Sequence, residues 1–141
     1  MMRPLCLGLI LLVKAQFLYS QNIDWNRTYN WRLYKINSRL GFGYSLDTLH
    51  NFKSIMLNND TVQNYLQSVS VIPLEKTPVW MGAYIASCQL SDGTVRKIEI
   101  GKYGGFFFDE IEKKYYELPL TIRKEWLNYL SDTYENIPST P

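Results

Sequence analysis

Cys88 and His50 are the residues of this chain best suited to nucleophilic catalysis, because a thiol beside an imidazole base can form an activated nucleophile. Cys88, however, lies in an apolar stretch with Tyr84 and Ala86, where a cysteine usually serves as a small buried side chain. His50 has neither a glycine turn nor an adjacent acidic residue to mark a catalytic element. A reactive thiol needs an accessible setting that stabilises the thiolate. We therefore expect no catalytic cysteine.

Three carboxylates, those of Asp109, Glu110 and Glu112, stand close together in the sequence beside Lys113 and Lys114. Two carboxylates at a suitable separation can act as acid and base, or acid and nucleophile, at a glycosidic bond. This group falls where a hairpin turn is expected, and charged residues in turns are ordinarily solvated. We expect a solvated turn, and we keep a hydrolase of extracellular polysaccharide as the alternative.

The chain offers few ligands for a metal ion or a cofactor. It contains one histidine and two cysteines, and it lacks a DxDxDG loop, an HExxH pair and a CxxC pair. The sequence therefore predicts no metal site and no cofactor.

A glycine-rich stretch, Gly101-Lys102-Tyr103-Gly104-Gly105, resembles a phosphate-binding loop only superficially. The lysine precedes the glycine pair, and a Phe-rich strand follows instead of the helix whose N-terminus would bind the anion. We expect Gly101 and Gly104 to take the strained angles of a turn or bulge, and Gly105 to let a backbone or a ring approach closely. Lys102 and Tyr103 would then occupy a rigid, exposed corner.

Aromatic residues are unusually common, with 4 Trp, 11 Tyr and 6 Phe. Tyrosine suits binding surfaces because its ring is rigid and apolar and its hydroxyl can hydrogen-bond. We expect most of these rings to fill the core of a small domain and the rest to be available to a partner. Together with the glycine corner, the candidate binding residues are Trp25, Trp31, Tyr44, Lys102 and Tyr103.

The first twenty residues have the pattern of a secretory signal peptide. Arg3 supplies a positive charge, an apolar run of nine residues extends from Leu5 to Val13, and small residues follow. A helix that crosses the bilayer needs about 20 apolar residues. We therefore expect cleavage after Ala15 or Ser20, export to the periplasm or the exterior, and no stable membrane anchor. A buried N-terminal strand is the alternative.

Removing this leader changes the charge balance. The whole chain has 15 basic and 13 acidic residues, and the leader contains Arg3 and Lys14, so 13 of each remain. A nearly neutral chain lacks the excess of basic residues that nucleic acid or an anionic membrane surface requires. The leader also contains Cys6, so Cys88 would be left without a partner for a disulfide.

The first half of the remaining chain is predicted to form one strand followed by two helices. Residues 29–37 alternate in polarity as a strand does. A helix capped by Asp47 would follow over residues 47–56, with its apolar side chains on one side. Asn59 or Asp60 would cap a second helix.

The second half predicts a meander of strands and a final helix. Residues 79–90 are apolar on both alternating faces, as in a strand covered on two sides. Asp92-Gly93 is a strong signal for a hairpin turn. We expect four antiparallel strands over residues 79–118, followed by a helix that opens at Pro119 and carries one apolar stripe.

The element order β-α-α-β-β-β-β-α predicts an α+β fold, in which a sheet of four to five antiparallel strands carries its helices on one face. The composition, 46% hydrophobic and 20% charged, is typical of a globular protein. We expect one domain over residues 21–136 and a flexible tail over 137–141. A closed lipocalin-like barrel is the alternative fold.

These features favour a small exported binding domain that is not an enzyme. Its expected partner is another protein, as for an inhibitor, an immunity-type partner of a secreted toxin or a component of an envelope assembly. Carbohydrate is a second class of partner, because stacked rings hold sugars. The alternatives are the polysaccharide hydrolase described above and a small-ligand binding protein with a cavity between sheet and helices.

Overall fold

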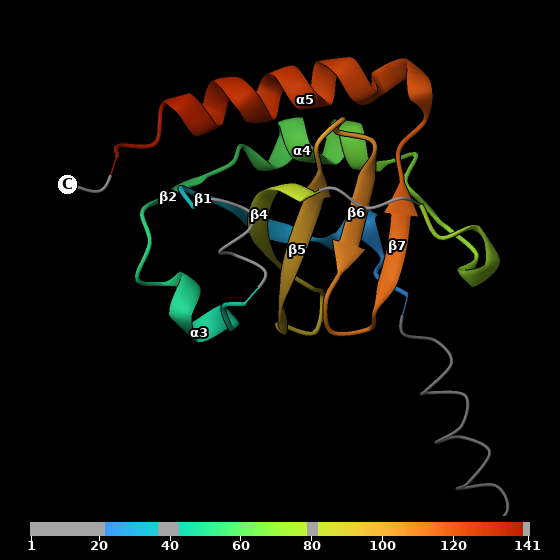
Figure 1. The fold of residues 1–141 in the computed structure, drawn as a ribbon, viewed down its shortest axis with the longest axis horizontal. Coiled ribbons are helices and arrows are strands. Elements are labelled where there is room, and N and C mark those ends of the chain that lie inside the picture. The colour runs from blue at the N-terminus through green and yellow to red at the C-terminus, as the bar shows by residue number, and fades with distance from the viewer. Residues whose placement is uncertain (1–21, 37–42, 79–81, 140–141) are drawn as a thin grey trace, which may run out of the picture.

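A computed structural model describes residues 22–36, 43–78 and 82–139, which form an antiparallel sheet with helices against it (Figure 1). The strands are β1 (Tyr29–Tyr34), β2 (Ser54–Met56), β3 (Ser70–Val71), β4 (Gly82–Gln89), β5 (Val95–Gly101), β6 (Phe106–Asp109) and β7 (Lys114–Glu117). The helices are α3 (Leu46–Leu49), α4 (Asn59–Leu66) and α5 (Leu120–Glu135), with short 3-10 turns η1 (Trp25–Arg27) and η2 (Leu74–Lys76). This arrangement confirms the α+β class.

The sheet has seven strands in the order β2-β1-β4-β5-β6-β7-β3. The meander from β4 to β7 is confirmed, but the prediction of four to five strands was too low because β2 and β3 were missed. These two short strands form the edges of the described sheet and do not pair with each other. The described sheet is therefore open, and the lipocalin-like alternative is wrong.

The helix predicted over residues 47–56 is mostly a different structure. Only α3 is helical, and its cap is Ser45, whose hydroxyl accepts from the Thr48 N–H, so the cap predicted at Asp47 is wrong. The chain then extends as β2 and pairs with β1, with Ile55 opposite Leu33. A helix in this position would leave the outer edge of β1 without a hydrogen-bonding partner. Pairing between strands therefore outweighs the helical spacing of the apolar residues.

The cap of the next helix, α4, lies one residue before Asn59, the first of the two predicted caps. The side chain of Asn58 accepts from the Thr61 N–H at 3.0 Å, so Asn58 is the cap and Asn59 is already helical. After α4, β3 pairs with β7, with Val71 opposite Tyr116.

The predicted hairpin between β4 and β5 is confirmed. Leu90 N–H donates to the Thr94 carbonyl at 2.8 Å, and the turn between them ends at Gly93, whose φ is +86°. A three-residue loop of this kind places its last residue in the left-handed region, where glycine is favoured.

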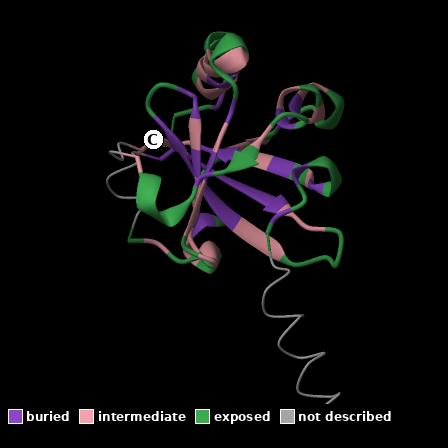
Figure 2. Cartoon of the chain, turned by 90° about the vertical axis from the view of Figure 1, so that its right-hand side faces the viewer, coloured by how far each residue is buried: buried purple, intermediate pink, exposed green. Residues whose placement is uncertain are grey.

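The main core lies between α4, α5 and one face of the sheet, hereafter the helix face. Figure 2 shows the buried residues gathered along the strands, with exposed residues on the outer sides of the helices. Fully buried residues come from β1, β4, β5, β6 and α5, and include Trp31, Ala86, Ile98, Phe107 and Trp126. Each large apolar side chain buried in this way stabilises the fold by about 1.5–3 kcal/mol.

A smaller core lies on the opposite face, hereafter the α3 face. Tyr34, Leu49 and Ile85 are buried there, and Phe52 packs partly against them. Helix α3 therefore covers this second face, whereas α4 and α5 cover the helix face, so the prediction that all helices pack on one face is wrong.

The C-terminal helix begins where it was predicted, but the segment that follows it differs from the prediction. Pro119 is the cap of α5, and Trp126 and Leu130 are fully buried on its apolar stripe. Ile137, which was expected in a flexible tail, is only 2% exposed and belongs to the main core. Of the helices in the described ranges, none combines the length and the apolar character that crossing a membrane would require.

Candidate functional site

Trp25 and Trp31 are not available to a partner. Trp25 is 5% exposed and Trp31 is 0% exposed, and their rings stack at a centroid distance of 5.9 Å. The indole N–H of Trp31 donates to the hydroxyl of Thr28 at 3.0 Å. The η1 turn brings Trp25 over the helix face, on which β1 also places Trp31. The prediction that these two rings are accessible is therefore wrong.

Tyr44 is half-buried and serves the smaller core. Its ring packs against Phe52 at a centroid distance of 5.2 Å, and its backbone carbonyl accepts from Lys97 Nζ at 2.9 Å. These contacts attach the segment before α3 to the α3 face of β5. Tyr44 thus has a structural task that accounts for its partial burial.

Lys102 and Tyr103 lie at the turn between β5 and β6, and both are exposed. The Tyr103 side chain is 72% exposed, and Lys102 Nζ lies 5.8 Å from the centroid of its ring. The exposed corner expected from the glycines is therefore present. Its role in binding stays a prediction.

The glycines of this corner allow close packing against α5. Gly104 has φ +73°, and a Cβ added to it would lie 2.9 Å from Leu127 Cβ and 3.0 Å from the Arg123 carbonyl oxygen. A Cβ on Gly105 would lie 2.5 Å from Cδ of Arg123, so its neighbour is a guanidinium side chain and not the backbone or ring that was expected. Gly101 has no positive φ, and the prediction of strained angles there is wrong.

The carboxylates considered for hydrolysis are held by basic side chains. Asp109 is 0% exposed and its Oδ2 lies 3.1 Å from an amino nitrogen of Arg96, while Glu112 lies 3.5 Å from the other. Glu110 pairs instead with Lys97 at 2.8 Å. The hairpin turn is confirmed over residues 110–113, but the expectation that these charged side chains are simply solvated is wrong.

These carboxylates also do not converge on one reaction site. Arg96 is two residues from Ile98 on β5, and Asp109 is two residues from Phe107 on β6, so both point to the helix face. Lys97 lies on the opposite face, so its partner Glu110 is separated from Asp109 by the sheet. The pair of free carboxylates that glycoside hydrolysis needs is absent from this described group.

Burial raises the pKa of Asp109, and this effect exceeds the opposing effect of the Arg96 guanidinium. The Ile111 N–H also donates to its carboxylate at 3.3 Å. A raised pKa is common in catalytic acids. Here, however, the carboxyl group has no exposed surface with which to touch a substrate.

Cys88 is free and buried, as predicted, and burial raises the pKa of its thiol far above the ordinary value. The thiol therefore stays protonated at any physiological pH. His50 is exposed at the C-terminal end of α3. A protonated, buried thiol and an exposed imidazole do not form a nucleophile and its base.

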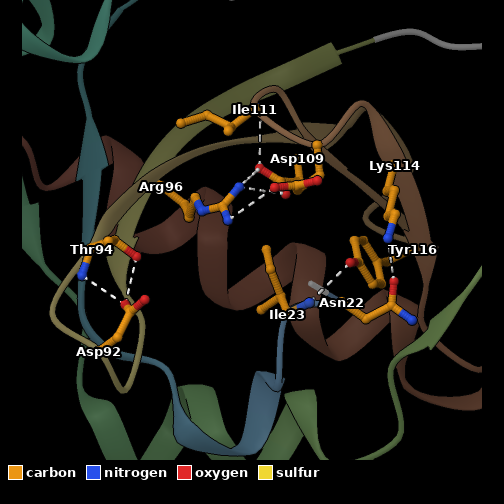
Figure 3. A network of polar contacts seen from close by, with 10 residues as sticks. Asn22, Ile23, Asp92, Thr94, Arg96, Asp109, Ile111, Lys114 and Tyr116 are labelled. Carbon is orange, nitrogen blue, oxygen red and sulfur yellow. Dashed lines mark hydrogen bonds and ion pairs between the residues drawn. The ribbon is translucent and has the colours of Figure 1, made fainter. Parts of the chain in front are cut away.

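An open pocket of about 740 Å³ lies at the end of the sheet where the β4–β5 and β6–β7 hairpins turn (Figure 3). Its volume is within the range usual for ligand sites. Apolar walls come from Ile23, Leu90, Val95 and Ile111. The polar lining groups belong to Asn22, Asp24, Ser91, Asp92, Thr94 and Arg96.

Hydrogen bonds fix several of these polar groups. The Asp92 carboxylate accepts from the N–H and the hydroxyl of Thr94, at 3.0 and 2.7 Å, and these bonds lower its pKa. The Ile23 N–H donates to the Tyr116 hydroxyl at 3.2 Å, which attaches the N-terminal segment to β7. The pocket walls are therefore held by the sheet.

The pocket was not predicted from the sequence, although one signal for it was available. Alternation along β5 places Arg96 on the same face as Ile98 and Ile100, where a charged side chain needs a partner. That partner, Asp109, is thirteen positions away and became evident only from the pairing of β5 with β6.

A smaller pocket of about 290 Å³ lies beside the β6–β7 turn and η2. Val71, Leu74 and Tyr115 line it, and Leu74 is largely exposed. Both pockets therefore adjoin the same hairpin turn.

Among the described residues, no group of three or more histidine, cysteine or acidic side chains is arranged to hold a metal ion. Comparisons of the chain with models of protein families, with curated proteins and with solved structures found no match.

Proposed function

We propose that the chain is a small exported domain that binds another protein and catalyses no reaction. It binds through its hairpin end, which we define as residues 22–24, 90–96 and 111. The observation that carries this proposal is the open pocket at that end, with Ile111 standing at its rim with 61% of its surface exposed.

A protein partner accounts best for the mixture of groups at the hairpin end. Exposed Ile111 stands among charged and hydroxyl-bearing neighbours such as Asp92 and Thr94. Protein interfaces combine apolar anchors with a polar rim in this way. A rigid strand end also limits the entropy lost on association.

The alternatives have less support. A hydrolase would need carboxylates that are free to act, whereas Asp109, Glu110 and Glu112 are paired with Arg96 or Lys97. A small-ligand carrier would need space between the sheet and the helices. That space holds packed rings, since Phe107 lies 5.3 Å from Trp25 and 5.9 Å from Trp126, measured between ring centroids.

Position-specific photocrosslinking tests the proposal. A benzophenone side chain replaces Ile111 in one variant and Met56 in the other, and both are exported from the native host. Met56 is a matched control, because it is also an exposed apolar residue but lies on the edge strand β2. We expect one discrete protein adduct from position 111 and none from position 56. No adduct at 111, or the same adducts at both positions, would contradict the proposal.

Export is tested separately. N-terminal sequencing of the protein recovered outside the cytoplasm is expected to begin at Gln16 or Gln21, as the two cleavage sites require. An intact Met1 on all recovered protein would overturn the proposed cleavage, and finding the protein only in the cytoplasm would overturn the proposed localisation. Either result would leave protein binding open.

A further inference from the structure

We propose that the pocket at the hairpin end receives a lysine or arginine side chain of the partner protein. This inference rests on the proposed function, because it names the chemical group that the same site recognises. It follows from the apolar walls, from the carboxylates at the rim and from the state of the one guanidinium in the lining.

The walls fit the aliphatic stem of a long basic side chain. Ile23 is buried behind the pocket, Leu90 and Val95 are half-buried, and Ile111 projects at the rim. Lysine and arginine commonly lay their methylene groups along apolar surface while their charged ends reach a polar group. A small inorganic cation would leave these walls in contact with water.

The Asp92 carboxylate supplies a partner for the charged end. Its Oδ1 accepts both hydrogen bonds from Thr94, so Oδ2 remains available. Figure 3 shows Asp92 and Thr94 at one border of the site, with Ile23 and Arg96 across from them. Asp24 adds a second carboxylate, which contacts the exposed Arg27 at 3.5 Å. An exposed pair of this kind contributes little energy and exchanges readily.

Arg96 does not turn the pocket into an anion site. Its guanidinium already contacts two carboxylates, those of Asp109 and Glu112, and is only 11% exposed. The amine of Lys114 donates to the amide oxygen of Asn22, a lining residue, at 2.7 Å. Of the residues that define the hairpin end, two carry carboxylates, Asp24 and Asp92, and one is basic, Arg96, whose charge is already offset by Asp109 and Glu112. The excess favours a cation.

The test uses the processed full chain and a peptide probe, acetyl-Gly-Arg-Gly-amide, followed by NMR titration of backbone amides. The control peptide carries citrulline, which matches arginine in shape but has no charge. We expect the arginine peptide to shift the amides of Thr94 and Ile111. Asp92→Asn keeps the acceptor for Thr94 and is expected to weaken binding about tenfold, the usual effect of removing a charged hydrogen-bond partner. Asp60→Asn, at an exposed position in the first turn of α4, is expected to leave peptide binding unchanged.

Equal binding of the citrulline peptide, unchanged affinity in Asp92→Asn, or the absence of shifts at millimolar peptide would overturn the inference. The photocrosslinking result separates it from the proposed function. An adduct at position 111 whose yield is unchanged in Asp92→Asn would mean that a protein binds without a basic side chain in the pocket. Peptide binding without any protein adduct would mean that the pocket takes a basic group while the proposed function fails.

Discussion

Asp109 illustrates how a single buried carboxylate shapes this end of the molecule. Its ion pair with Arg96 and its bond from the Ile111 N–H orient the start of the β6–β7 turn, and with it the exposed Ile111. Burial nevertheless raises the pKa of Asp109, because removing a charge from water outweighs the attraction of the guanidinium. The same residue therefore positions the hairpin and weakens the fold when it is ionised.

The pH dependence of stability follows from this shift. The folded chain holds the Asp109 proton more tightly than the unfolded chain, whose pKa is near the ordinary 3.8. The carboxylate therefore destabilises the fold above its folded pKa, and the loss shrinks as the pH falls through that value. Asp109→Asn carries no charge at this position. Its free energy of unfolding, relative to that of the natural chain, is therefore expected to be highest at about pH 7 and to fall progressively towards about pH 4. Urea unfolding at a series of pH values measures this difference.

Asp92 provides a control, because its contribution to stability depends on pH in the opposite direction. Hydrogen bonds from Thr94 lower its pKa, so its stabilising contribution is present above the unfolded value and is lost as the pH falls through the folded one. Asp92→Asn should therefore approach the natural chain in stability as the pH is lowered. If both variants changed in the same direction with pH, the assignment of burial as the dominant effect at Asp109 would be wrong.

Substitutions at Gly104 and Gly93 distinguish the destabilisation caused by backbone strain from that caused by close packing. Both have positive φ, but a Cβ on Gly104 would collide with α5, whereas a Cβ on Gly93 meets nothing within 4 Å. We expect Gly104→Ala to lower the free energy of unfolding by about 2–4 kcal/mol and Gly93→Ala by about 1 kcal/mol. Chemical denaturation measures both. Equal losses would show that the contact of Gly104 with Leu127 and Arg123 contributes nothing.

Among the elements, β2 and α4 differ in how far local sequence preference determines their structure. At β2 tertiary pairing outweighs that preference, whereas at α4 the preference determines where the helix begins. The segment of β2 has helical spacing but pairs with β1, because the hydrogen bonds of an edge strand are gained only in the folded sheet. At α4 the local rule holds, with the cap one residue from the predicted position. Asn58, Asn59 and Asp60 are all good caps, so the sequence could not choose among them.

The cap position is directly testable. Asn58→Ala removes the acceptor for the Thr61 N–H and is expected to lower the free energy of unfolding by about 1 kcal/mol. Asn59→Ala changes an exposed residue inside the first turn and should alter it by less than about 0.5 kcal/mol. Thermal and urea unfolding compare the two. A larger loss of unfolding free energy in Asn59→Ala than in Asn58→Ala would mean that Asn59 is the cap, as the sequence indicated.

The molecule as a whole is a sheet with a large aromatic core on the helix face and a smaller core on the α3 face. This division explains why most of the aromatic residues are structural. It also leaves the hairpin end, at one end of the strands, as a surface with fixed walls across which none of α3, α4 and α5 passes (Figure 1). Binding there would require little rearrangement.

The main core extends past the last helix, which gives a prediction for the whole fold. Ile137 is nearly fully buried, so Ile137→Ala is expected to lower the free energy of unfolding by about 2–4 kcal/mol. Leu120→Ala, a comparable truncation at the exposed start of α5, should change it by less than about 0.5 kcal/mol. A shift below about 1 kcal/mol for Ile137→Ala would mean that the C-terminal segment is a loose tail after all.

Features that depend on near neighbours could be predicted from the sequence. The alternation of β1, the Asp92-Gly93 turn, the meander from β4 to β7 and the helix after Pro119 rest on periodicity and turn chemistry, which act over a few residues. The burial of Cys88 followed from the same patterns, because both neighbouring faces of its strand are apolar.

What could not be predicted depends on residues distant in the sequence. The burial of Trp25 and Trp31, the ion pair of Arg96 with Asp109 and the pocket beside it arise only when strands pair and η1 folds over the sheet. Their partners lie in other elements, and strand register decides which side chains meet. Local sequence thus specified most of the elements, whereas the candidate site came from long-range packing, because the groups that form it come from separate turns.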